Sequence, residues 1–272
     1  MNNRMKKVSK RLGELETQFF AYTQLRNKST VRTGDLVSNL AITEVQERKL
    51  LFQLCRSGLI ARLKRGLYLV PPRIPAGGKW GPDEFLILFE LMKAMEGRYQ
   101  VCGPTAFHFY GFDEQIPNRV YLYNNRIYGD RKIGGTSFTF IKTSDERLGG
   151  VYTFKTPEGV EAVWSSKTRT LVDAVYDWSR FNTIPRSYNW IRSFLSAERE
   201  SLKELIEMTL KYGNQGTIRR IGYLLETMGI QKRWLNRLRG GLSLSSSLIP
   251  WIPRILARGK IVKEWGLIVN EP

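Results

Sequence analysis

The sequence predicts an α+β fold, in which an N-terminal winged helix-turn-helix is followed by a larger mixed α/β domain with a helical C-terminal part. Three observations predict it. Residues 1–75 show three helical patterns and then a hairpin pattern, residues 76–181 mix helical and β-rich runs, and residues 182–272 are mostly amphipathic. Prolines and glycines punctuate the chain between residues 71 and 78. We therefore predict two domains, 1–75 and 76–272, a number that suits 272 residues.

The first 75 residues contain three predicted helices. Apolar residues at helical spacing predict a helix over 12–25, and a short helix is expected over 33–40, with the threonine that opens it as the N-cap. The third helix begins after Thr43, because Thr43 followed by Gln46 is a capping-box pattern. Gly58 is a natural stop for that helix.

A hairpin follows the third helix. The β-rich runs 59–63 and 67–70 flank Lys64-Arg65-Gly66, and Pro71-Pro72 ends the unit. Three helices followed by a hairpin is the order of a winged helix-turn-helix, a fold that places a helix in the major groove of DNA.

Beyond residue 75, helices and strands alternate before the chain becomes helical. Helices are predicted over 82–96, 104–110 and 167–179, and strands over 120–123, 137–141, 151–155 and 160–164. The last part predicts helices over 188–195, 201–212, 217–228 and 232–238.

The charge of the chain is concentrated at its two ends. The chain has 43 Lys and Arg against 25 Asp and Glu, a net charge of +18. Residues 1–75 carry 15 basic and 5 acidic side chains, residues 76–181 carry 13 of each, and residues 182–272 carry 15 and 7. Positive charge of this size attracts polyanions, so one or two nucleic-acid contact surfaces are expected.

The third helix has a polar face. With Glu44 placed at zero and about 100° added per residue, Lys49, Gln53 and Arg56 fall within an arc of about 120–220° that holds no apolar residue. The remaining arc is predicted to be the apolar one, interrupted by charged residues; its apolar members are Val45, Leu50, Leu51, Phe52, Leu54 and Cys55. Gln, Lys and Arg match the base edges of the major groove.

Two sets of residues are candidates for nucleic-acid contacts. The N-terminal set is predicted to bind DNA through the third helix, the hairpin and the segment before the second helix, and comprises Lys28, Arg32, Thr43, Gln46, Lys49, Gln53, Arg56, Arg62, Lys64 and Arg65. A second basic patch is expected at Arg219, Arg220, Lys232, Arg233, Arg237 and Arg239. An acidic protein partner or plain solubility is the alternative explanation of the second set.

Catalytic and metal-binding patterns are not found in the sequence. The single histidine, His108, lies among aromatic residues and is expected to be packed, and one His with two distant Cys cannot form the usual zinc sets. Asp173 and Asp177 lie one helical turn apart, but Arg169 is equally placed to pair with Asp173, so charge on a helix surface is expected. We predict no enzyme, metal or cofactor; a metal-dependent nuclease that uses Asp173 and a protein-interaction module remain alternatives.

Cysteine usage and hydropathy indicate the compartment. Cys55 and Cys102 lie in apolar surroundings and form no CxxC pair, which is typical of buried thiols in a reducing cytosol. The most apolar stretch, 85–92, is far shorter than the roughly 20 residues that span a bilayer. A soluble cytoplasmic protein with no membrane partner is expected.

Four groups of residues, in this order, are similar to a known family. They are Gly58-Leu59-Ile60 with Arg65-Gly66-Leu67-Tyr68; Gly103-Pro104-Thr105-Ala106 with Tyr110-Gly111-Phe112 and Gln115-Ile116-Pro117; Arg169-Thr170-Leu171-Val172-Asp173-Ala174; and Tyr212-Gly213-Asn214 with Arg219-Arg220-Ile221-Gly222-Tyr223-Leu224-Leu225-Glu226. With these residues the chain resembles the AbiEi family, the antitoxins and transcriptional regulators of type IV abortive-infection toxin–antitoxin systems.

The resemblance implies a function in phage defence. It implies a repressor whose N-terminal domain binds inverted repeats of double-stranded DNA in its own promoter. It also implies a C-terminal domain that counteracts a nucleotidyltransferase-like toxin, without forming a stable complex with it. Only the winged-helix positions carry a residue-level function in this resemblance, and the other segments are expected to be structural.

Overall fold

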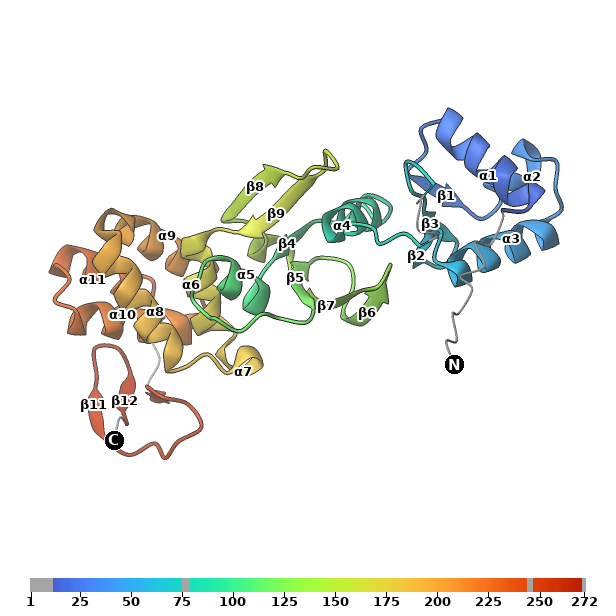
Figure 1. Ribbon diagram of the computed structural model, residues 1–272. Coiled ribbons are helices and arrows are strands. Elements are labelled where there is room, and N and C mark those ends of the chain that lie inside the picture. Colours follow the sequence, from blue (N-terminus) through green and yellow to red (C-terminus); the bar gives the residue numbers. More distant parts are fainter. Residues whose placement is uncertain (1–11, 75–78, 244–246, 271–272) are drawn as a thin grey trace, which may run out of the picture. The chain divides into compact units, whose positions relative to one another are not determined.

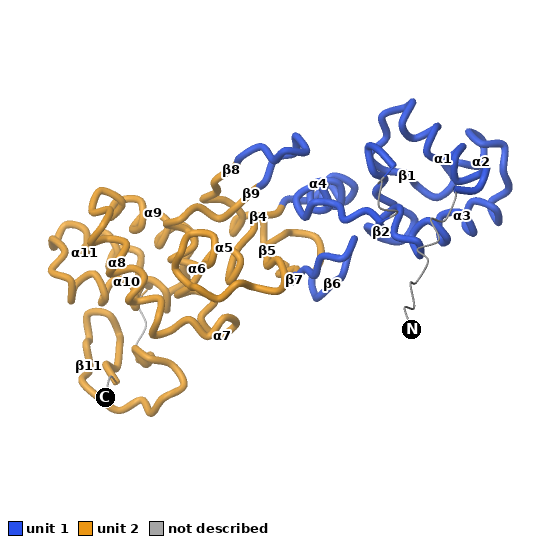
Figure 2. Tube along the Cα trace, in the orientation of Figure 1, with its two compact units in different colours: residues 1–98, 128–139, 154–162 blue, residues 99–127, 140–153, 163–272 orange. Residues whose placement is uncertain are grey.

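The computed structural model describes residues 12–74, 79–243 and 247–270, and its architecture is mixed α+β with several sheets, as predicted (Figure 1). Residues 75–78 of the punctuated stretch lie outside the described residues. The chain divides into two compact units (Figure 2): unit 1 is 1–98, 128–139 and 154–162, and unit 2 is 99–127, 140–153 and 163–272. The functional division at residue 75 stays a prediction.

The first part of unit 1 contains three helices and a three-stranded sheet. Its elements are α1 (Glu14–Leu25), β1 (Thr30–Arg32), α2 (Asp35–Asn39), α3 (Glu44–Ser57), β2 (Ala61–Lys64) and β3 (Leu67–Leu69). The strands run antiparallel in the order β1-β3-β2. The three predicted helices and the hairpin are present. Strand β1 was not expected, because three residues carry too little periodicity to predict a strand.

These elements share one apolar core. Phe19 and Phe20 of α1, Leu36 of α2, and Leu50 and Leu54 of α3 are all buried in it. The helix patterns were predictable because each helix directs one apolar stripe toward this core.

A six-stranded sheet occupies the middle of the chain, in the order β6-β7-β5-β4-β9-β8. The strands are β4 (Tyr99–Val101), β5 (Val120–Asn124), β6 (Gly129–Ile133), β7 (Thr136–Lys142), β8 (Val151–Lys155) and β9 (Glu161–Ser165). Strand β4 pairs antiparallel with β5 and parallel with β9. The sequence did not predict β4, which has only three residues, or β6, whose first four residues are exposed and lack an alternating apolar pattern.

The helices that accompany the sheet are α4 (Glu84–Lys93), α5 (Gly103–Phe109), α6 (Lys167–Tyr176) and α7 (Trp178–Phe181). The predicted helix over 167–179 is therefore two helices, separated at Asp177. In the motifs expected to be structural, Leu171 and Val172 are fully buried, and Gly111 has a positive φ of 72° in the turn after α5.

The C-terminal part of unit 2 is helical, as predicted, and ends in a small sheet (Figure 1). Its helices are α8 (Arg186–Ala197), α9 (Leu202–Tyr212), α10 (Gln215–Thr227) and α11 (Lys232–Arg239), and the sheet has the order β10-β12-β11 (Ile249–Pro250, Leu267–Val269, Lys260–Val262). Trp251 and Trp265 are fully buried in the core of these elements. A Cβ atom on Gly222 would lie 2.1 Å from the ring of Trp265, so only glycine allows this contact. Across the described ranges, no helix combines the length and apolar character that crossing a membrane requires.

Candidate nucleic-acid interface

Helix α3 begins and ends where the sequence predicts. The Thr43 hydroxyl accepts the backbone N–H of Gln46 at 3.2 Å, and the Gln46 side-chain oxygen accepts the Thr43 N–H at 2.8 Å. This reciprocal pair is a capping box. Gly58 ends the helix with a left-handed φ of 73°, which residues with a Cβ rarely adopt.

A buried carboxylate joins α3 to α2. Glu47 is fully buried, and it accepts the backbone N–H of Gly34 at 2.8 Å and that of Leu36 at 2.9 Å. Helix α2 therefore starts after Gly34, whose φ is 100°, and receives its N-terminal cap from another helix. The expected N-cap at Thr33 is corrected by this arrangement. Glu47 holds α3 at a defined position against α2, a role that local sequence patterns do not reveal.

The outward face of α3 carries the central residues of the predicted interface. Lys49, Gln53 and Arg56 are exposed, and within the described part of the chain their side chains have no polar partner. The opposite face buries Leu50, Leu51 and Leu54 in the core. Charged and amide groups that the protein leaves unpaired are available to a ligand.

The apolar arc predicted for α3 needs a correction. Val45 and Phe52 were expected in that arc, but they are 68% and 64% exposed, on the same side of the helix as Lys49 and Arg56. The buried face is instead centred on Glu47, Leu50 and Leu54. The Glu47 carboxylate on this face accepts the Leu36 N–H at the start of α2, so this side of α3 faces the interior.

Thr43 and Gln46 have a structural role. Because the Thr43 hydroxyl and the Gln46 carbonyl oxygen are engaged in the capping box, both residues first of all define the start of the helix. The Gln46 side chain retains its amide NH₂ as a donor group.

The hairpin presents two of its three predicted cations. Arg62 on β2 is exposed, and Arg65 is exposed in the turn, next to Gly66 with a φ of 74°. The Lys64 ammonium instead donates to the carbonyl of Ala94 at 3.1 Å, at the C-terminal end of α4. Lys64 thus stabilises the end of a helix within unit 1. We expected it at a free hairpin tip, and the structure corrects this.

The segment before α2 is organised by Asp35. Its carboxylate accepts the backbone N–H of Arg32 at 2.9 Å and lies 3.8 Å from the ammonium of Lys28. Lys28 also lies 5.4 Å from the centre of the Tyr22 ring. The Arg32 side chain is exposed. The structure therefore leaves the side chains of six predicted residues outward, namely Arg32, Lys49, Gln53, Arg56, Arg62 and Arg65.

Three of the six residues predicted for the second basic patch are engaged in hydrogen bonds within the protein. Arg219 and Arg220 are only 5% and 6% exposed, and they donate to the carbonyls of Ser247 at 2.8 Å and of Pro250 at 3.0 Å. Burial lowers the pKa of the Arg220 guanidinium from its ordinary value. Arg239 donates to the carboxylates of Glu226 and Glu264. These three arginines hold unit 2 together, so they are not available to phosphate.

The rest of that patch lies on α11. Lys232 and Arg233 are exposed, and Arg237 lies 3.5 Å from the carboxylate of Glu207. Among the described residues, Lys232 and Arg233 have no carboxylate partner, and Arg233 lies 5.1 Å from the centre of the Trp234 ring. Two such cations on one helix are too few to define a nucleic-acid surface, so α11 is a weaker candidate interface than α3.

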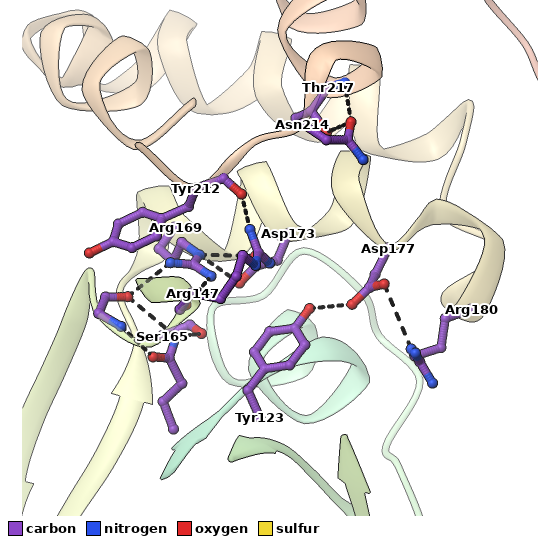
Figure 3. Close-up of polar contacts among 12 residues, drawn as sticks. Tyr123, Arg147, Ser165, Arg169, Asp173, Asp177, Arg180, Tyr212, Asn214 and Thr217 are labelled. Atoms are coloured by element: carbon purple, nitrogen blue, oxygen red, sulfur yellow. Dashed lines mark hydrogen bonds and ion pairs between the residues drawn. The ribbon is translucent and has the colours of Figure 1, made fainter. Parts of the chain in front are cut away.

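Asp173, the carboxylate considered for a nuclease, lies in a buried ionic cluster of unit 2, whereas Asp177 is partly exposed and accepts the Tyr123 hydroxyl (Figure 3). Asp173 is fully buried and accepts from Arg169 at 2.9 Å and from Arg147 at 3.0 Å. The predicted Arg169–Asp173 pair is confirmed, but it lies in the interior and not on a helix surface. Both guanidinium groups also donate to backbone carbonyls, Arg169 to Gly149 and Arg147 to Tyr212. A carboxylate that neutralises two arginines has little capacity left for a metal ion.

Other potential catalytic groups are not assembled into a site. Within 12–74, 79–243 and 247–270, no group of three or more His, Cys, Asp and Glu is arranged to hold a metal ion. His108, expected to be packed, is exposed. Burial raises the pKa of the half-buried Cys55 thiol to about 11, and it also raises the pKa of the fully buried Cys102 thiol well above its ordinary value. Neither thiol is therefore an activated nucleophile at neutral pH.

Comparisons with known proteins define the fold but not the function. The sequence matches no family model and no curated protein. The structure is similar to the crystal structure of the RV2827C protein from Mycobacterium tuberculosis, with a TM-score of 0.57 and 14% identity, over 94% of this chain and 92% of that one. At this identity the likeness shows that the two chains share a fold along almost their whole length.

Proposed function

We propose that the chain is a winged helix-turn-helix protein that binds double-stranded DNA and represses transcription, with α3 as its recognition helix. The observation that carries this proposal is the outward face of α3, where Lys49, Gln53 and Arg56 are exposed without intramolecular polar partners among the described residues. The order α1, α2, α3 and hairpin β2–β3 supports it, because winged helices use this order.

The two parts of the proposed interface have different tasks. Gln53 and Arg56 offer the paired donors and acceptors that match adenine and guanine edges, so α3 supplies base readout. Arg62 and Arg65 on the hairpin and Arg32 before α2 are exposed point charges and bind phosphate, which positions the domain without reading sequence. Glu47 is a positioning residue, since it fixes α3 against α2.

The biological setting is proposed from the family resemblance. The chain would repress its own promoter at inverted repeats and act as an antitoxin against a nucleotidyltransferase-like toxin, without a stable complex. The segments 103–117, 169–174 and 212–226, which carry this resemblance, lie in unit 2. We therefore assign the antitoxin activity to the part beyond residue 75 and the operator binding to the part before it. No cofactor enters this proposal.

The test compares two variants that lose the same charge. Full-length protein is titrated against a duplex of the DNA upstream of its own reading frame, followed by fluorescence anisotropy. Lys49→Ala/Arg56→Ala should weaken binding at least about 30-fold, because each of the two lost contacts costs on the order of 1–3 kcal/mol. The control is Arg199→Ala/Lys203→Ala, two exposed cations of unit 2 outside all predicted contacts. Equal affinity of both double variants would overturn the assignment of α3.

A further inference from the structure

Helix α3 exposes two apolar side chains in the middle of its solvent-exposed face. Val45 is 68% and Phe52 64% exposed, while Leu50, Leu51 and Leu54 of the same helix are buried. A single exposed apolar residue is ordinary on a protein surface. Two of them beside the exposed cations Lys49 and Arg56 form a mixed apolar and basic surface that is available to a partner.

The four residues follow one another along a single stripe. Val45, Lys49, Phe52 and Arg56 are separated by four, three and four positions, which is the spacing of neighbours on one side of an α-helix. Val45 and Phe52 lie seven residues apart, a rise of about 10 Å along the helix. Apolar and basic side chains thus alternate along the outward stripe.

The alternation of apolar and basic side chains favours one kind of binding partner over another. A second copy of the chain placed on the same face would bring Lys49 and Arg56 of both copies together, and like charges in contact oppose association. Glu44, the acidic residue next to Val45 in the sequence, pairs with Arg48 at 3.8 Å, outside the stripe. The partner that fits is a polyanion that also exposes apolar groups.

Duplex DNA has these properties in its major groove. Its phosphates supply the negative charge, and the C5-methyl group of thymine is the apolar group among the base edges. Resting on the proposed function, we infer that Val45 and Phe52 are specificity-determining residues that contact thymine methyl groups, while Lys49 and Arg56 contact phosphate or guanine. The recognition helix therefore prefers sites with thymine at two separate positions.

The experiment removes the methyl groups from the DNA. A preferred site is selected with full-length protein from a random duplex library, and it is then synthesised with every thymine replaced by uracil, which pairs identically but lacks the methyl group. Burial of one methyl group is equivalent to about fourfold in affinity, so the native protein should bind the uracil duplex about 10- to 20-fold more weakly.

Variants separate this inference from the proposed function. Val45→Ala/Phe52→Ala should bind thymine and uracil duplexes with equal affinity, whereas Lys49→Ala/Arg56→Ala should weaken both equally and keep the thymine preference. The matched control is Ile255→Ala/Leu256→Ala, which removes exposed apolar side chains from unit 2 and should keep both affinities. Circular dichroism of every variant checks that it is folded.

Four outcomes would overturn the inference. Equal affinity of the native protein for both duplexes shows that no methyl group is read, although the DNA-binding function stands. A thymine preference that survives in Val45→Ala/Phe52→Ala assigns it to other residues. A change of oligomeric state in that variant, with the thymine preference unaltered, shows that the stripe binds a second copy. Failure to bind any duplex at low salt would overturn the proposed function as well.

Discussion

The cations on the outward face of α3 and the buried arginines of unit 2 are similar residue types in opposite situations. On α3, Lys49 and Arg56 are exposed, with no polar partner among the described residues. In unit 2, Arg169 and Arg220 are buried, and carboxylates or backbone carbonyls occupy their guanidinium groups. Positive charge in the sequence therefore divides into exposed charge, which is available to a ligand, and buried charge, which stabilises the fold. Only the partners of each side chain distinguish the two.

The largest effect on stability is expected when the buried arginines of unit 2 lose their carboxylate partner. Asp173→Asn leaves the guanidinium groups of Arg169 and Arg147 buried without a carboxylate. Removal of one partner of a buried ion pair costs about 3–5 kcal/mol. In a domain of this size, this corresponds to a fall in melting temperature on the order of 10 °C, measured by circular dichroism.

A half-exposed ion pair gives the matched control. Lys167 and Glu198 form such a pair, and both side chains are more than a third exposed. Glu198→Gln should change stability by less than about 1 kcal/mol. If Asp173→Asn melts at the same temperature as Glu198→Gln, the buried pair stabilises the fold no more than the half-exposed pair, which contradicts the prediction.

The sequence predicts features that depend on residues close together in the chain, and it does not predict those that depend on distant residues. The start of α3 at Thr43 and its end at Gly58 were predictable, because both caps are formed by residues within the helix ends. The exposure of Phe52 was not, because the core side of α3 depends on how it packs against α1 and α2. Periodicity identifies a helix, but it does not rank faces that both contain apolar residues.

The burial of two residues of the second basic patch was not predictable from the sequence, for the same physical reason. Arg219 and Arg220 look like a surface pair in the sequence, yet their carbonyl partners come from residues 247 and 250, about 30 positions further along. Small strands such as β4 and β11, three residues each, exist because neighbouring strands pair with them. Tertiary context determines these features, and local patterns do not contain it.

A smaller effect is expected from replacing Glu47, which stabilises the fold and also positions α3. Glu47→Ala leaves the N–H groups of Gly34 and of the buried Leu36 without their acceptor, at a cost of about 2–3 kcal/mol. Because α3 then loses its fixed position against α2, DNA affinity should fall, although Glu47 is fully buried. Urea unfolding and the anisotropy titration, both at 10 °C, measure the two effects.

The conservative variant tells positioning from general destabilisation. Glu47→Gln keeps one acceptor oxygen and should recover most of the DNA affinity, while remaining less stable than the native protein. A Glu47→Ala variant that is destabilised but binds DNA normally below its unfolding transition would contradict the positioning role.

The smallest effect is expected in the hairpin, where exposed arginines lie next to a lysine that is hydrogen-bonded within the protein. Arg62 and Arg65 are exposed, whereas the Lys64 ammonium is bonded to the Ala94 carbonyl. Each phosphate contact contributes about −0.9 to the slope of log affinity against log salt. Arg62→Ala/Arg65→Ala should therefore make the slope less steep by about 1.8, at similar sequence preference. Lys64→Ala should leave the slope unchanged, because its ammonium stabilises α4 instead. A Lys64→Ala slope that flattens as much as that of a single Arg62→Ala variant would show that Lys64 leaves its carbonyl partner to bind phosphate, and the division between the two kinds of charge would then depend on the ligand.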